Sequence, residues 1–254
     1  MVVSNWEDKF YKAYTKQQIS VITSLLDEKD PSSLLKFSRI DFKNGDSEYL
    51  NTVLNNEIWL SNPKEFNDPF DCAMLIEDEI MNYNGIEISK AKVFDSIKRN
   101  IFISCFSEKR VLNKPLMWAH YAESHKGICL EYDFAEIILY ESRILPVLYK
   151  NDFKGLNKLY DKNKDEFTLN AIYTKATDWK YEREWRLVEF RDTSEKGFKM
   201  NFIKPKNIYI GCKNNSDELT KILSDYCKQQ AIGLYEMKMK PNSFKLYHEK
   251  IGTQ

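Results

Sequence analysis

The sequence predicts an α+β protein, built as a single domain on a mixed or split β-sheet that is flanked by helices. The 254 residues, 43% of them hydrophobic, are enough to bury a sizeable core. β-rich runs and amphipathic helical segments follow one another in a mixed order, neither strictly alternating nor all-β. The few glycines and prolines sit singly at segment boundaries. We therefore expect one domain over residues 1–254, with a helical N-terminal segment at 1–31.

The segments of the N-terminal half are assigned from periodicity and turn chemistry. One or two helices over residues 7–31 precede the strand "SLLKFSRI". "SEYLNTVLNNE" is predicted to be a helix, because its apolar residues recur at helical spacing and Ser47 can cap it. "EIWLSNP" predicts a short strand, and "KEFNDPFDC" a loop that buries Phe66 and Phe70. The helix "SKAKVFDSIKRN" and the strand "IFISCFSE" follow.

The C-terminal half continues the same mixture. "KPLMWAHYAESHKG" is predicted to be a helix that Gly127 terminates. "ICLEYDF" and "ILPVLYK" are predicted strands, and "FTLNAIYTKATDWKYERE" begins as a helix that leads into the strand "EWRLVEF". The strand "NIYIGCK", the helix "SDELTKILSDYCKQQ" and a last strand, "IGLYEMKMK", complete the prediction.

Composition limits the classes of function. Thirty-eight basic residues balance thirty-eight acidic ones, so the total charge gives no sign of nucleic-acid binding. No apolar run approaches the ~20 residues that span a bilayer, and the first residues do not resemble a secretory signal. The five cysteines are scattered, with no CxxC pair, which favours reduced thiols over structural zinc. We expect a cytoplasmic protein without a membrane partner and without a metal.

The stretch "YEREWRL" raises the central question about function. On a strand, Glu182, Glu184 and Arg186 share one face. Two carboxylates on an otherwise apolar strand indicate either a solvated face or acids held toward a substrate. Glu184→Gln is expected to change folding little, because relief of repulsion with Glu182 offsets a lost pairing with Arg186.

Two further polar clusters precede that strand. Lys36 and Arg39 fall on opposite faces of the first predicted strand, so at most one faces a given cleft. Ser61 ends the next strand, and Asp68 and Asp71 follow in a turn, where backbone hydrogen bonds are their simplest role.

The helix "MWAHY" carries a third cluster. Its aromatic stripe indicates core packing, and His120 is expected to cap a network or line a cleft, with Tyr121 as a second candidate for a direct role. His120 and His125 are five residues apart, so they do not form the i, i+4 pair that binds zinc on a helix.

Several of these stretches together resemble a known family. "LLKFSRI", "FNDPFDC", "ISCFSE", "LMWAHYAESHKGICLEYDF", "LPVLYK" and "YEREWRL" occur in this order in a large bacterial family described only as a domain of unknown function. The resemblance covers about residues 32–213. The succession of a basic strand, a strand that ends in serine and a late Glu-x-Glu strand also resembles the layout of ADP-ribosyltransferases. That resemblance implies a related fold, NAD as substrate, and a place among bacterial defence or toxin proteins such as those active against phage.

The second resemblance implies roles for particular residues. Glu184 stabilises the oxocarbenium-like ribose left when nicotinamide departs, and Glu182 positions or deprotonates the acceptor. Arg39 or Lys36 holds the pyrophosphate, while Ser61 or Ser104 braces the ribose or Glu184. Trp118 or Tyr121 stacks on the nicotinamide ring, and His120 is a further residue expected to bind NAD. The layout requires Glu184, Arg39 and Ser61 to meet in one concave site. Four classes of acceptor stay open, namely protein, nucleic acid, a small molecule and water, and the sequence specifies neither the acceptor nor the oligomeric state.

Two other classes of function stay open. A metal-dependent nuclease could use Asp68 or Asp71 with Glu131 and Asp133, which share a strand face in "LEYD". The other class is a non-enzymatic sensing or interaction domain, in which the polar clusters serve turns and surfaces.

Overall fold

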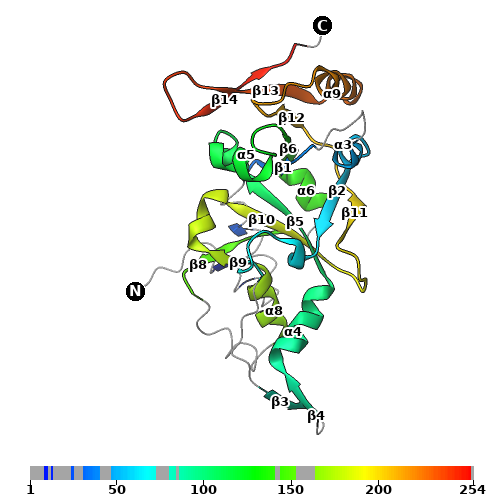
Figure 1. Cartoon of the computed structure of the whole chain (residues 1–254), viewed down its shortest axis with the longest axis vertical. Helices are drawn as coiled ribbons and strands as arrows, with labels where there is room; N and C mark the ends of the chain where they lie inside the picture. The colour runs from blue at the N-terminus through cyan, green and yellow to red at the C-terminus, as the bar shows by residue number, and fades with distance from the viewer. Residues whose placement is uncertain are drawn as a thin grey trace. The chain divides into compact units, whose positions relative to one another are not determined.

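The computed structural model describes residues 9–10, 13, 24–25, 31–40, 47–72, 80–83, 86–140, 144–152 and 164–252. The predicted helices of residues 7–31 lie almost wholly outside these residues. The strands of the described part are β1 (Ser33–Ser38), β2 (Glu57–Ser61), β3 (Ile80–Tyr83), β4 (Ile86–Ser89), β5 (Ile101–Glu108), β6 (Ile128–Asp133), β7 (Ile144–Pro146), β8 (Leu148–Lys150), β9 (Thr174–Ala176), β10 (Glu184–Phe190), β11 (Gly197–Asn201), β12 (Asn207–Ile210), β13 (Gly233–Met239) and β14 (Leu246–Lys250) (Figure 1).

Helices are interspersed among these strands. The α-helices are α3 (Glu48–Leu54), α4 (Lys90–Arg99), α5 (Pro115–Tyr121), α6 (Phe134–Tyr140), α8 (Lys164–Ile172) and α9 (Asp217–Gln230), and the 3-10 turns are η1 (Pro63–Glu65), η2 (Lys109–Val111) and η3 (Thr177–Glu182). This mixed sheet with flanking helices confirms the predicted α+β class. None of the described helices is long and apolar enough to cross a membrane.

The chain divides into two compact units, each assembled from separated segments. The first unit holds Met1–Asp30, Leu60–Ser104 and Arg143–Phe198, and the second holds Pro31–Trp59, Cys105–Ser142 and Lys199–Gln254. Strands β2, β5 and β11 each contribute residues to both units. The expectation of one domain over residues 1–254 stays a prediction.

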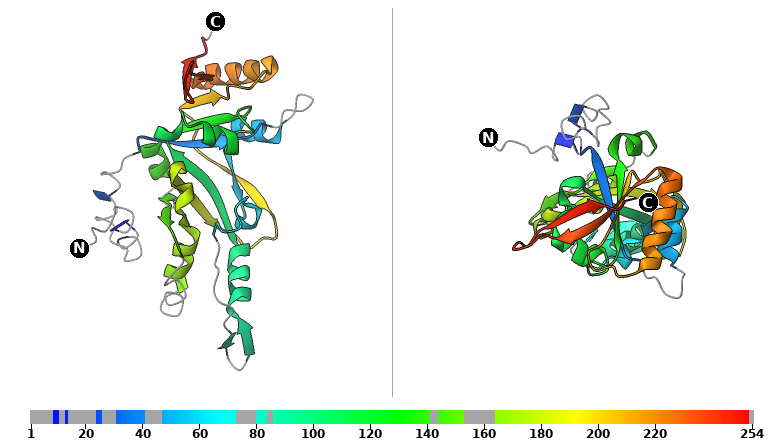
Figure 2. Two further views of the ribbon diagram at one scale, coloured as in Figure 1. Left: turned by 60° about the vertical axis from the view of Figure 1, so that its left-hand side comes forward. Right: turned by 90° about the horizontal axis from the view of Figure 1, so that it is seen from above.

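The second unit carries a mixed sheet in the order β5-β1-β6-β12-β13-β14. Strand β1 is antiparallel to β5 and β6, whereas β12 is parallel to β13. Helices α5 and α6 contact β1, and α9 packs along β13 (Figure 2). The apolar residues that α9 buries include Leu219 and Leu223, one helical turn apart, and Ser216 caps its first turn.

The first unit is built around β10. This strand pairs with β5 and with β7, and β2 pairs with β5 at Ser61 and Ile103. Strands β8 and β9 form a separate parallel pair, and the β3–β4 hairpin leads into α4 (Figure 1). Strand β10 is buried over most of its length, which explains its run of apolar residues.

Most local predictions hold, but several are wrong. Helix α3 begins as expected, with the Ser47 hydroxyl accepting a hydrogen bond from the Leu50 amide at 3.2 Å. The loop "FNDPFDC" leaves the Phe70 side chain 60% exposed rather than buried. Helix α5 ends at Tyr121, well before Gly127, and β14 follows β13, which had been expected to be the last strand.

Candidate functional site

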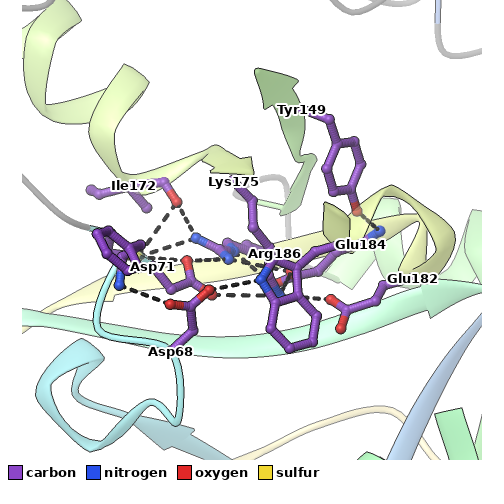
Figure 3. Close-up of polar contacts among 11 residues, drawn as sticks. Asp68, Asp71, Tyr149, Ile172, Lys175, Glu182, Glu184 and Arg186 are labelled. Carbon is purple, nitrogen blue, oxygen red and sulfur yellow. Dashed lines mark hydrogen bonds and ion pairs between the residues drawn. The ribbon is translucent and has the colours of Figure 1, made fainter. Parts of the chain in front are cut away.

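Five ionisable side chains meet inside the first unit (Figure 3). They come from the turn after η1, from β9, from the end of η3 and from β10, and all are at least 94% buried: Asp71, Lys175, Glu182, Glu184 and Arg186. We call this group the ionic cluster. Because charged groups are costly to bury without partners, the geometry of their pairing decides what the cluster can do.

The backbone between the two glutamates differs from the predicted continuous strand. Glu182 ends the turn η3, and β10 begins only at Glu184. The intervening Arg183 has a φ of 48°, in the left-handed region that non-glycine residues rarely adopt. The sharing of a strand face therefore holds for Glu184 and Arg186, whereas Glu182 reaches the same cluster from a turn.

Arg186 uses its whole guanidinium within the protein. Its Nε donates to Glu184 Oε1 at 2.7 Å, and Nη2 donates to Asp71 Oδ1 at 2.6 Å and to Glu184 Oε2 at 3.2 Å. Nη1 donates to the Cys72 thiol at 3.1 Å and to the Ile172 carbonyl. The five N–H groups thus have five acceptors, so Arg186 orients Glu184 rather than binding a ligand itself.

Lys175 joins the two glutamates. Its Nζ lies 2.6 Å from Glu182 Oε2, 2.9 Å from Glu184 Oε2 and 3.5 Å from Asp71 Oδ2. Burial alone would lower the pKa of Lys175, but Glu184, Asp71 and Glu182 together raise it above its usual range. Lys175 is therefore a fixed cation that holds two carboxylate oxygens close together.

Aromatic side chains border the cluster. The Trp179 indole lies under the Lys175 ammonium, which is 4.9 Å from the ring centroid, and its Nε1 donates to Asp68 Oδ2 at 2.7 Å. Tyr181 is tilted against Trp179, with the ring centroids 6.2 Å apart. The Tyr149 hydroxyl accepts the Glu184 backbone N–H at 2.8 Å, and burial, followed by the charge of Glu184, raises its pKa (Figure 3). Tyr149 is accordingly a neutral hydroxyl beside the carboxylates.

The two serines that were expected to brace the ribose or Glu184 lie on paired strands of this unit. Ser61 is half-buried on β2 opposite Ile103, and Ser104 follows that residue on β5 and is 1% exposed. Strand β10, which carries Glu184, pairs directly with β5. The structure thus places Ser104 on the strand next to that of Glu184.

The basic residues that were expected to hold the pyrophosphate belong to the second unit. Arg39 is exposed and stacks over Tyr49 at 4.5 Å from the ring centroid. Lys36 is half-buried above Phe106, and burial, opposed by Cys105, lowers its pKa to about 8. A joint site for Arg39, Ser61 and Glu184 stays a prediction.

The aromatic helix α5 also belongs to the second unit. Trp118 is fully buried, and its indole N–H donates to the Leu112 carbonyl at 2.7 Å. It therefore cannot stack on a ligand, contrary to the expectation from the sequence. Tyr121 is half-buried, and the exposed His120 packs edge-on against it. These two side chains remain accessible from solvent.

The residues of the nuclease alternative have structural partners. Glu131 of β6 is fully buried, accepts hydrogen bonds from Tyr209 and Asn207 at 2.6 and 2.8 Å, and pairs with Lys109 at 2.6 Å. Asp133 caps the first turn of α6. Within the described ranges, no three His, Cys, Asp or Glu side chains are grouped so that they could hold a metal ion.

Lys175, Asp71 and Tyr149 are the members of the site that sequence reasoning missed or misread. Asp71 was assigned to a turn, yet it pairs with an arginine 115 positions away. Lys175 stands in "TKATDW", which has no apolar periodicity and gave no local signal. Only the cost of burying Arg186 on an apolar strand hinted at hidden acidic partners.

Comparison with known proteins reaches part of this site. Residues 117–187 match the family model described as "Protein of unknown function (DUF2971)". This match confirms the predicted resemblance to a family of unknown function, over a shorter stretch than the expected 32–213. It covers Lys175, both glutamates and Arg186, and leaves Asp71 outside. No curated protein and no solved structure matched the chain.

Proposed function

We propose that the ionic cluster is the catalytic centre of a bacterial NAD-consuming enzyme, an ADP-ribosyltransferase or NAD glycohydrolase that breaks the bond between nicotinamide and ribose. The observation that carries this proposal is the pair of carboxylates, Glu182 and Glu184, held by the single ammonium of Lys175. Departure of neutral nicotinamide leaves positive charge on the ribose, and fixed carboxylates are the groups that stabilise such charge.

The proposed division of labour follows from how each glutamate is held. Glu184 is fixed by Arg186 and Lys175, which suits a carboxylate that must be oriented before the reaction begins. Glu182 ends a turn and has Lys175 as its ion-pair partner, which suits a group that positions or deprotonates an acceptor. Tyr149 adds a neutral hydroxyl beside them.

The remaining assignments rest on the resemblance to ADP-ribosyltransferases. Arg39, or Lys36 in its place, holds the pyrophosphate of NAD, and Ser104 or Ser61 braces the ribose. Tyr121 and His120 of α5 are accessible from solvent, and we assign them to contact the nicotinamide part of NAD. We place the enzyme in the bacterial cytoplasm, in a defence or toxin role.

A non-enzymatic interaction domain is the second candidate, and a specific observation favours it. Every N–H of Arg186 is already satisfied inside the protein, and Lys175 contacts three carboxylates. A fully satisfied network of this kind is sufficient to specify a fold without binding any ligand. In that case Glu182 and Glu184 hold the first unit together and contact no substrate.

The experiment that tests the proposal compares transfer with hydrolysis. The full chain is incubated with NAD and a panel of protein and nucleic-acid acceptors, and both free nicotinamide and labelled acceptor are measured. For Glu182→Gln we expect acceptor labelling to fall about 10²-fold while nicotinamide release largely persists, because breaking the first bond needs no acceptor base. A parent protein that neither releases nicotinamide nor labels any acceptor would favour the interaction domain.

A further inference from the structure

A cysteine and a histidine from distant parts of the sequence face each other in the second unit. The Cys212 sulfur, just after β12, lies 3.9 Å from Nδ1 of His125, in the turn after α5. Both side chains are half-buried, so each is partly open to solvent. Neither belongs to the ionic cluster, and the proposed function does not use them.

The backbone around His125 is strained in a way that sets the position of this side chain. Three successive residues, Glu123, Ser124 and His125, have φ values of 48°, 53° and 72°. Each non-glycine residue in this region costs on the order of 1 kcal/mol or more. The His125 amide donates to the Trp118 carbonyl at 3.1 Å, which anchors the turn to the end of α5.

The segment of residues 125–127 and the segment of residues 211–213 are also held together by backbone hydrogen bonds. The Lys213 amide donates to the His125 carbonyl at 2.9 Å, and the Gly211 amide donates to the Gly127 carbonyl at 2.8 Å. A Cβ atom at Gly211 would lie 2.2 Å from the His125 carbonyl oxygen, so only glycine permits this approach. Cys212 and His125 are therefore fixed neighbours and do not meet by chance motion of two loops.

We propose that Cys212 and His125 form a thiol site that exchanges with small disulfides. His125 Nδ1 accepts the thiol proton as the Cys212 sulfur attacks one sulfur of the disulfide. A new S–S bond to Cys212 forms, the old S–S bond breaks, and the departing thiolate takes up the proton. The net change is one protein thiol and one small disulfide converted into one mixed disulfide and one small thiol.

The electrostatic surroundings favour a neutral thiol beside a neutral imidazole over a preformed thiolate–imidazolium pair, so the proton moves only as the sulfur attacks. Burial raises the pKa of Cys212, an effect opposed by its own backbone N–H and by Lys213 and reinforced by Glu236. Burial, and then the charge of Lys213, lower the pKa of His125. At neutral pH the imidazole is therefore unprotonated and can accept the thiol proton.

The test uses the aromatic disulfide 5,5′-dithiobis(2-nitrobenzoic acid) with the native full chain, and mass spectrometry to locate the adduct. We expect Cys212 to react first, so that Cys212→Ser removes the fast phase. The matched control Cys105→Ser, which removes another half-buried thiol, should keep it. His125→Asn, which tolerates the left-handed backbone, should slow the fast phase about 10²-fold at pH 7.

The pH dependence separates base assistance from a structural effect. Above the pKa of the thiol, the difference between the parent and His125→Asn should shrink, because solvent then ionises Cys212 without help. Mapping the first adduct of the unmutated protein to another cysteine would overturn the proposal, and so would parent-like kinetics of a folded His125→Asn variant at pH 7.

Discussion

The replacement of Glu184 by glutamine gives the sharpest prediction about the ionic cluster. Both carboxylate oxygens accept from cations: Oε1 from Arg186 at 2.7 Å, and Oε2 from Lys175 at 2.9 Å and Arg186 at 3.2 Å. A glutamine has one acceptor oxygen, so its NH₂ group must face a cationic donor whichever way the amide turns. The structure thus revises the expectation that Glu184→Gln is harmless to folding.

The size of the effect follows from this geometry. A hydrogen bond to a charged group is worth about 1.5–3 kcal/mol, and removing one partner of a buried ion pair typically costs about 3–5 kcal/mol. Since Lys175 and Arg186 keep Glu182 and Asp71 as partners, we expect the lower half of that range, about 3–4 kcal/mol.

The assay is urea unfolding at pH 7 followed by circular dichroism. Glu182→Gln is the matched control, because its amide oxygen can still accept from Lys175, and it should lose less stability than Glu184→Gln. A Glu184→Gln variant as stable as the parent would show that the cluster is looser than its distances indicate.

Three further predictions concern the rest of the molecule. Burial would raise the pKa of Glu131, but hydrogen bonds from Lys109, Tyr209, Asn207 and Ser33 together lower it to about 2, against an ordinary 4.5. About 3 kcal/mol of the stability present at neutral pH should therefore be lost as the pH falls from 4.5 toward 2. Urea unfolding measured across this pH range should show the loss in the parent and not in Glu131→Gln. Arg183→Gly should raise the free energy of unfolding in urea by about 1 kcal/mol by relieving the left-handed backbone, and an unchanged or lower value would contradict this. Gly211→Ala should lower the melting temperature by several degrees, because the added Cβ would clash with the carbonyl oxygen of His125. An unchanged melting curve would show that the turn at residues 123–125 can move away.

Local features of the fold were predictable from the sequence because their causes are local. The serine cap of α3 and the apolar run of β10 carry their signals within a few residues. Helix α5 was predicted too long because the strained turn at residues 123–125 leaves no mark in composition. The prediction that Gly127 ends a helix was wrong for a similar reason, since that glycine allows a close approach to the Ser38 carbonyl.

The candidate site was only partly predictable, because its pairings are distant in sequence. The carboxylates of "YEREWRL" stood out as polar residues beside an apolar strand. Their partner Lys175 comes from a separate strand, and Asp71 joins them from more than a hundred residues away. Such pairs depend on tertiary packing, which neither periodicity nor turn chemistry encodes.

Nicotinamide release from NAD by the purified full chain tests the central claim most directly. The account predicts release by the parent and a loss of about 10²–10³-fold in Glu184→Gln, measured at a temperature where circular dichroism shows the variant folded. Glu131→Gln makes the same chemical change at a buried glutamate outside the cluster and should release nicotinamide at the parental rate. Equal rates for the parent and a folded Glu184→Gln, or no release by the parent at all, would contradict the assignment of the ionic cluster as a catalytic centre.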